Sequence, residues 1–142
     1  MVIESKINDV VSQLKTLGYP AKPTKDGVTS FITDVHSVQH GILITQTEDG
    51  EFQLDCQICT LGDLEKKHTD EKETLSLAWV LLSINSSIQP WSVALINPDN
   101  QLDPSDVLVL TTKVKDFENN SVLEEMIGAL EQAMVHVSSV LN

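Results

Sequence analysis

Cys56 and Cys59 are the residues of this chain whose types and spacing could most readily do chemistry. A Cys-x-x-Cys pair acts as a redox dithiol when its first thiolate lies at the start of a helix, where the helix dipole lowers the thiol pKa. Together with His36 and His40, the same pair forms a His-x3-His…Cys-x2-Cys set, which suits tetrahedral zinc. The two cysteines could therefore form a redox dithiol, take part in a zinc site or have a purely structural role. The secondary structure around them indicates which of these applies.

The pattern around the cysteines favours the structural role. Residues 52–58 alternate apolar and polar side chains, which predicts a half-buried strand with Cys56 on its apolar face. Side chains three positions apart on a regular strand point to opposite faces, so Cys56 and Cys59 should not converge. We therefore expect two small apolar cysteines, with no metal site and no cofactor.

Other residue types that could carry catalysis lack the required spacing. Asp99, Asp103 and Asp106 cluster in a predicted loop and could hold a weak cation, but their spacing does not follow the EF-hand pattern. None of the six glycines forms the Gly-x-Gly of a phosphate-binding loop, and no serine lies in a nucleophile elbow. We expect no catalytic residues and a protein that is not an enzyme.

The charge balance restricts the partners. The 142 residues include no arginine, and 21 carboxylates outnumber nine lysines to give a formal net charge of -12. Proteins that bind nucleic acid neutralise phosphates with clustered lysine and arginine, so DNA and RNA are excluded as expected partners. No apolar run approaches the roughly 18 residues of a membrane span, and residues 1–6 do not resemble a signal peptide. We expect a cytoplasmic, soluble protein.

The hydrophobic periodicity predicts one α+β domain over residues 1–142, in the order α-β-β-β-α-β-β-α, with an antiparallel sheet packed against helices. Gly18 and Pro20 should end the first helix, residues 19–27 read as a connection, and Asp49-Gly50 should turn a hairpin. The predicted helices cover residues 3–17, 70–84 and 121–141, and the predicted strands cover residues 28–35, 42–47, 52–58, 91–96 and 106–112.

This order of elements resembles the class I chaperones of type III secretion and the wider fold group that shares their architecture. The resemblance covers nearly the whole chain as architecture. It is carried best by the apolar run that ends at Asn85, by the strands over residues 91–96 and 107–110, and by the apolar stripe of residues 123–141. It implies a small, acidic, dimeric protein that binds an extended or partly unfolded segment of another protein.

Two functions follow as hypotheses. The first is a non-enzymatic, chaperone-like module that binds a segment of a partner protein. The alternative is a regulatory or stress-associated protein that binds a folded partner, because uncharacterised bacterial proteins of the YjfI type are similar in size and acidity. One fold supports several uses, so the resemblance does not choose between them.

Trp79 and Trp91 are the candidate partner-binding residues. Large aromatic side chains usually belong to the core, but tryptophan is also enriched at the binding hot spots of protein interfaces. Trp79 lies in residues 75–84, which are apolar almost all round, and such a helix must be covered on more than one side. A second copy could supply that cover, and we therefore expect a homodimer.

Overall fold

A computed structural model describes residues 2–25, 27–33, 37–63, 79–96, 105–115 and 120–141. The chain is a single α+β domain, which confirms the predicted fold class. Its elements are α1 (Val2–Thr16), β1 (Lys22–Pro23), β2 (Val28–Thr33), β3 (Gln39–Gln46), β4 (Phe52–Thr60), η1 (Asn85–Ser87), β5 (Ser92–Ile96), β6 (Val107–Val114) and α4 (Asn120–Leu141). Residues 79–84 are helical and lead directly into η1.

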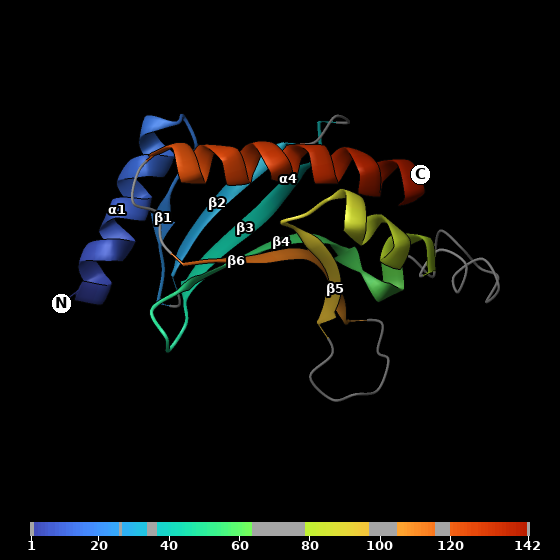
Figure 1. Ribbon diagram of the computed structural model, residues 1–142, viewed down its shortest axis with the longest axis horizontal. Coiled ribbons are helices and arrows are strands. Elements are labelled where there is room, and N and C mark those ends of the chain that lie inside the picture. The colour runs from blue at the N-terminus through green and yellow to red at the C-terminus, as the bar shows by residue number, and fades with distance from the viewer. Residues whose placement is uncertain are drawn as a thin grey trace.

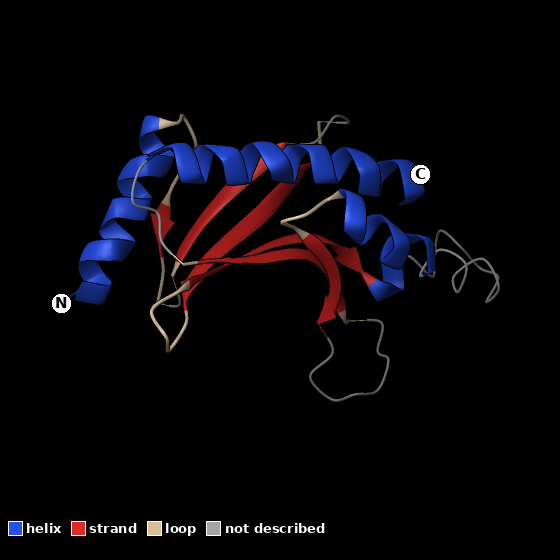
Figure 2. Cartoon of the chain, in the orientation of Figure 1, coloured by secondary structure: helices blue, strands red, loops and turns tan. Residues whose placement is uncertain are grey.

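The sheet has the strand order β1-β2-β3-β4-β6-β5, and every neighbouring pair is antiparallel (Figure 2). Five of these strands lie where the periodicity predicts them. The sixth, β1, lies within residues 19–27, which were expected to form only a connection. Lys22 and Pro23 pair with Thr29 and Val28 through the backbone. A two-residue strand has no alternating side-chain pattern, so the sequence carries no signal for it.

Gly18 and Gly50 end α1 and turn the β3–β4 hairpin, as predicted. Gly18 has a φ of 90°, and the N–H of Tyr19 donates to the carbonyl of Leu14 at 2.9 Å. This pattern is the left-handed cap that satisfies the last carbonyls of a helix. Gly50 has a φ of 84°, which the tight turn requires and which costs glycine little. Glycine at a positive φ therefore fixes both the end of α1 and the turn between β3 and β4.

Tyr19 joins the end of α1 to the middle of α4. Its hydroxyl donates to Glu131 Oε1 at 3.0 Å. Partial burial, followed by the hydrogen bond and charge of Glu131, raises the pKa of Tyr19, because each favours the neutral phenol over the phenolate.

The helix α4 lies along one face of the sheet, and the helical residues 79–84 lie on that same side (Figure 1). The buried stripe of α4 packs against the inward-facing side chains of the central strands. The stripe consists of Leu123, Met126, Ile127, Leu130, Ala133, Met134, Val137 and Leu141. From α1, Val10 and Leu14 complete the core at one end.

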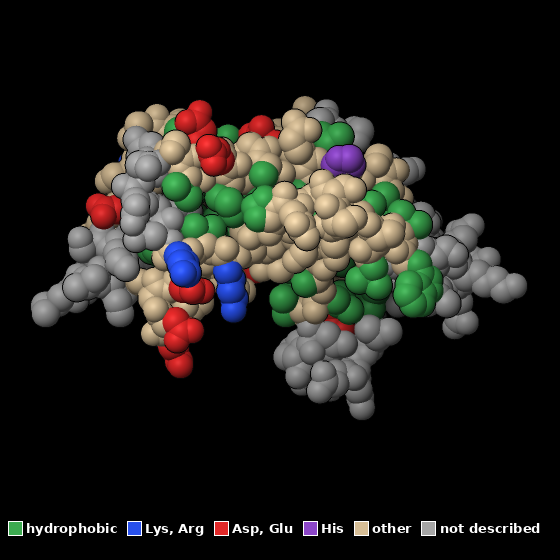
Figure 3. Space-filling model, in the orientation of Figure 1, with side chains coloured by type: hydrophobic (Ala, Val, Ile, Leu, Met, Phe, Trp, Pro, Cys, Tyr) green, Lys and Arg blue, Asp and Glu red, His purple; other side chains and the backbone are tan. Residues whose placement is uncertain are grey.

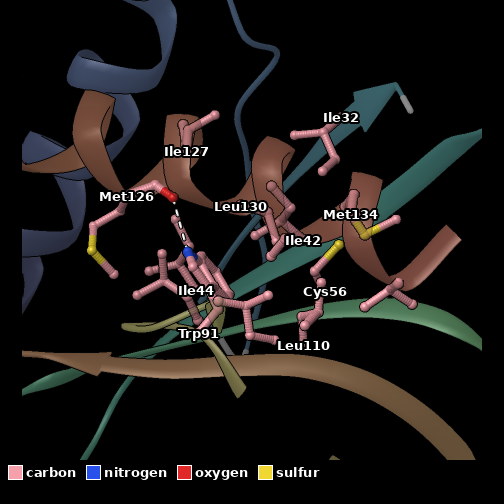
Figure 4. Close-up of a cluster of buried hydrophobic side chains, with 14 of the residues drawn as sticks. Ile32, Ile42, Ile44, Cys56, Trp91, Leu110, Met126, Ile127, Leu130 and Met134 are labelled. Atoms are coloured by element: carbon pink, nitrogen blue, oxygen red, sulfur yellow. Dashed lines mark hydrogen bonds between the residues drawn. The ribbon is translucent and has the colours of Figure 1, made fainter. Parts of the chain in front are cut away.

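Trp91 occupies the centre of this layer. Its side chain has 0% exposure, and its Nε1–H donates to the backbone carbonyl of Met126 at 2.9 Å. Figure 4 shows the ring between α4 and the strands, beside Ile44 and close to Leu110. Trp91 therefore fills the space between the two layers and also fixes their relative position by a buried hydrogen bond.

Replacing Trp91 should test this role directly. We expect Trp91→Ala to lower the free energy of unfolding by about 3–5 kcal/mol, because it leaves a large cavity beneath α4. Trp91→Phe keeps most of the apolar volume and should cost clearly less. Urea unfolding followed by far-UV circular dichroism measures both changes. Equal, small losses for the two variants would contradict the assignment of Trp91 to the core.

Gly27 provides a second stability test. A Cβ at this position would overlap the backbone carbonyl oxygen of Ile44 on β3, so Gly27→Ala must displace one strand from the other. Gly128 is the matched control, because a Cβ there on α4 meets open space. We expect Gly27→Ala to lower the melting temperature strongly. Gly128→Ala should stabilise the protein by up to about 1 kcal/mol through helix propensity; a reversal of this order would contradict the packing.

Candidate partner-binding surface

One stretch of the sequence carries no charged side chain. Residues 74–98 contain no aspartate, glutamate, lysine, arginine or histidine, in a chain where 21% of residues are charged. The structure describes residues 79–96 of this stretch, which are the helical segment, η1 and β5. A surface without charge is less costly to dehydrate, so this stretch is the first place to look for a protein interface.

The helical segment presents three large apolar side chains to solvent. Trp79 is 66% exposed, Leu82 is 58% exposed and Val80 is 43% exposed. On the opposite side of the same turn, Leu81 is buried in the core. We call Trp79, Val80 and Leu82 the Trp79 face. For residues 79–84, the expectation that this helix is covered on more than one side is therefore not met within a single chain, and residues 70–78 of the predicted helix lie outside the described residues.

The two predicted partner-binding tryptophans have different environments. Trp79 lies on the exposed face, whereas Trp91 is enclosed by α4 and the sheet. A side chain with no exposed surface cannot contact a partner, so Trp91 is corrected to a core residue. Sequence reasoning missed Val80 and Leu82. The signal that identifies them is the absence of charge throughout residues 74–98.

Figure 3 shows apolar side chains gathered at the lower right of the molecule, over β5 and the helical segment. The lysines and most of the carboxylates occupy other parts of the same view. Single exposed apolar side chains are common on any protein, but a group of them indicates an interaction site. The side chains with large exposure here are those of the Trp79 face together with Ile96 at the end of β5.

The sheet has two very different edges. At one edge, β1 has two residues, a lysine and a proline, and neither can extend the sheet readily. At the other edge, β5 has five residues with the sequence Ser-Val-Ala-Leu-Ile. A lysine and a proline are the usual means by which proteins prevent edge strands from pairing with other chains. Within the described residues, β5 carries neither.

Asn85 partly covers the β5 edge. Its side-chain Oδ1 accepts the backbone N–H of Val93 at 2.7 Å. Val93 therefore directs its N–H away from β6, and the side chain of Asn85 takes the place that a neighbouring strand would occupy. Alternate residues of a strand direct their backbone groups to the same side, so those of Leu95 also point away from β6.

A bulge in β4 changes the expected arrangement of the two thiols. Cys56 pairs with Leu110 and Cys59 pairs with Leu108, with a register shift between Gln57 and Cys59. Cross-strand partners share a face, and Leu108 and Leu110 both belong to the core cluster. The prediction that Cys56 and Cys59 point to opposite faces is thus wrong, because the extra residue of a bulge shifts the alternation.

The chemistry of Cys56 does not suit a redox dithiol. Cys56 and Cys59 do not form a disulfide, and burial raises the pKa of Cys56 to about 12. The Cys56 thiol is consequently protonated at neutral pH and is a poor nucleophile. Cys59 is only partly buried.

A shallow pocket of about 290 Å³ lies where β3 and β4 separate, and the residues that line it include His40, Cys59 and Asp63. The Nδ1–H of His40 donates to the carbonyl of Gln57 at 3.1 Å, because a carbonyl can only accept. The carboxylate of Asp63 accepts the N–H of Thr60, and the Thr60 hydroxyl accepts the N–H of Asp63. The side chains of His40 and Asp63 therefore fix the start of β3 and the end of β4.

Among the residues that the structure describes, no three histidine, cysteine or acidic side chains are grouped to hold a metal ion. His36, Asp99 and Asp103 lie outside the described residues, so the four-ligand zinc set and the aspartate cluster are not seen in full. Asp106 is buried, and its carbonyl accepts the N–H of Leu61 at 2.8 Å.

No protein family model matches this sequence, and no curated protein matches it significantly. The resemblance to secretion chaperones therefore remains a prediction from the order of elements. Within the described part of the chain, none of the helices combines the length and the apolar character that crossing a membrane requires.

The two thiols should react at very different rates. At neutral pH, iodoacetamide should modify the half-buried Cys59 of the folded protein well before Cys56, whose raised pKa keeps it protonated. Mass spectrometry of tryptic peptides over a time course measures the two rates, and the protein unfolded in urea is the control in which they converge. Preferential modification of Cys56 in the folded protein would contradict its burial.

Proposed function

We propose that this protein is a non-enzymatic, cytoplasmic, acidic protein-binding module with a chaperone-like architecture. Its activity is to bind an apolar segment of a partner protein on the Trp79 face. The observation that carries the proposal is the exposure of Trp79, Val80 and Leu82 within one turn of helix.

The chemistry of the Trp79 face suits an apolar partner segment. A tryptophan supplies a large, rigid contact area, and its indole N–H can still form a hydrogen bond at the rim. Val80 and Leu82 lie close to it on the same helix, while the nearby side chains of Ser83 and Ser86 are small and bond to the helix's own carbonyls at Val80 and Ser83. A partner can therefore approach the three apolar side chains without displacing a charged group.

The charge distribution supports selectivity for the partner. The formal net charge is -12, yet residues 74–98 contribute nothing to it. Carboxylates elsewhere repel nucleic acids and other acidic proteins, and they keep a complex soluble when its apolar surface is occupied. The partner segment that fits best is therefore apolar and carries neutral or basic flanking residues.

The thiols are consistent with a role in structure. Cys56 belongs to the core cluster, and its raised pKa makes it unreactive at neutral pH. The proposal therefore assigns no chemical step to the Cys-x-x-Cys motif.

Replacing Trp79 should weaken partner binding and leave the fold intact. Because Trp79 is exposed, we expect Trp79→Ser to unfold at nearly the same urea concentration as the wild type. The wild type and Trp79→Ser are each used to capture proteins from a lysate. A protein that only the wild type captures is then purified as the partner. Isothermal titration calorimetry should show binding at least about tenfold weaker for the variant, as expected for a hot-spot tryptophan.

Phe31 is the matched control. It is 51% exposed on β2, away from the uncharged stretch, so Phe31→Ser removes an exposed aromatic side chain of similar kind. This variant should bind the same partner with unchanged affinity. Equal weakening in both variants would indicate non-specific adhesion, and equal binding by Trp79→Ser and the wild type would refute the Trp79 face.

A further inference from the structure

The outward side of α4 carries negative charge that the helix itself does not balance. Residues 116–142 contain five acidic residues and no lysine, although the chain has nine lysines. Three of these acids, Glu124, Glu125 and Glu131, lie on α4 and are exposed. A lysine four residues after a glutamate stabilises a helix, and α4 has none. Cations that neutralise these carboxylates must therefore come from outside the helix.

The exposed side chains of α4 form a regular face with a low centre. Residues seven apart lie on one line of a helix, two turns from each other. Gly128 and Val135 form the centre line of the outward side. Glu124 and Glu131 flank that line on one side, and Glu125 flanks it on the other. A Cβ at Gly128 would meet open space, and Val135 is 43% exposed. We call these five residues the α4 face.

Tyr19 borders the α4 face on the side of Glu124 and Glu131. Its hydroxyl donates to Glu131 Oε1 at 3.0 Å. Partial burial is the main cause that raises the pKa of Tyr19, and the negative charges of Glu131 and Glu124 raise it further. The two carboxylates therefore act together on one part of the surface. Figure 3 shows carboxylates along the upper edge of the molecule, where α4 runs.

A basic amphipathic helix of another protein is the occupant that this face fits. The distance between two packed helices depends on the side chains at their contact, so Gly128 allows a close approach. Lysine or arginine side chains beside the partner's apolar stripe then reach the carboxylates on both sides of the centre line. A second copy of this chain is disfavoured, because it presents the same carboxylates and the same net charge of -12.

We propose that the α4 face binds a basic amphipathic helix of a partner protein, with Gly128 at the centre of the contact. Glu124, Glu125 and Glu131 pair with the cations of that helix, and Val135 packs against its apolar stripe. This surface is separate from the Trp79 face, which carries no charge, and neither binding event requires the other.

A synthetic peptide tests the chemistry of the partner. The probe is a helix of about 18 residues, or five turns, with leucine and alanine along one stripe and lysine on both sides of it. Its control has glutamate in place of every lysine. Fluorescence anisotropy should show saturable binding of the lysine peptide, weakened by added salt, and no binding of the glutamate peptide. Absence of saturable binding by the lysine peptide would overturn the proposal.

Charge removal at two places separates the α4 face from the net charge. Glu124→Gln combined with Glu131→Gln should weaken binding of the lysine peptide about fivefold, as expected for the loss of two exposed ion pairs. The glutamine oxygen at position 131 can still accept the Tyr19 hydroxyl. Glu48→Gln combined with Asp49→Asn removes two exposed carboxylates from the β3–β4 turn and should leave the affinity unchanged. Equal weakening by both pairs would show that only net charge matters.

Substitutions at Gly128 test the contact without disturbing the core. Gly128→Lys places a cation on the centre line, four residues after Glu124, so it should stabilise α4. It should nevertheless weaken binding of the lysine peptide at least about tenfold, because like charges then meet at the contact. Gly128→Ala adds one methyl group and should retain binding. Circular dichroism checks the fold of both variants, and full binding by Gly128→Lys would contradict the proposed contact.

The position of the bound peptide distinguishes the two surfaces. NMR amide shifts caused by the lysine peptide should fall on residues 121–135, and Trp79→Ser should bind this peptide with unchanged affinity. Shifts confined to residues 79–96 would overturn the inference and move the contact to the Trp79 face. Loss of peptide binding in the Gly128→Lys variant with retained capture of the partner leaves the proposed function standing, so the two proposals fail separately.

Discussion

Trp91 joins the helical layer to the sheet by two interactions at once. Its rings are buried among apolar side chains from α4 and the central strands, and its Nε1–H bonds to the carbonyl of Met126. The apolar burial is not directional, but the hydrogen bond is, so α4 is held at one position along the sheet. Thr112 adds to this anchor from β6, where its hydroxyl donates to the carbonyl of Pro90 at 2.8 Å. The start of β5 is therefore fixed from both layers.

This anchor determines what the rest of residues 79–96 can do. Because Trp91 and Ile88 are buried and Asn85 bonds to Val93, the segment is fastened to the sheet by its inner side. Among the described residues, its outer side carries the exposed side chains of the Trp79 face. A partner that binds there meets a surface that folding has already ordered, so little conformational entropy is lost on association.

The sequence predicted long, periodic elements well. The stripe from Leu123 to Leu141 and the alternation from Phe52 to Cys56 each reflect burial along a regular element, and both are found. Features that depend on individual pairwise contacts, and not on the periodicity of one element, were not predicted. Examples are the pairing of Lys22 with Thr29, the bulge beside Cys59 and the bond from Val93 to Asn85.

The candidate site was predicted only in part. Trp79 and Trp91 have the same side chain and lie in equally apolar stretches, and composition alone cannot tell which one the fold encloses. The difference arises from the direction in which each backbone segment presents its side chain to α4. Residues 74–98 do carry a usable signal, because they hold no charged side chain and charged residues are depleted at the centres of protein interfaces.

The different environments of the two indoles have a spectroscopic consequence. Trp79 and Trp91 are the two tryptophans of the chain, and one is largely exposed while the other is enclosed. The intrinsic fluorescence of the folded protein is thus the sum of a quenchable, water-contacting emitter and a protected one. Iodide reaches the first and not the second, so its quenching separates events at the outer surface from the opening of the core.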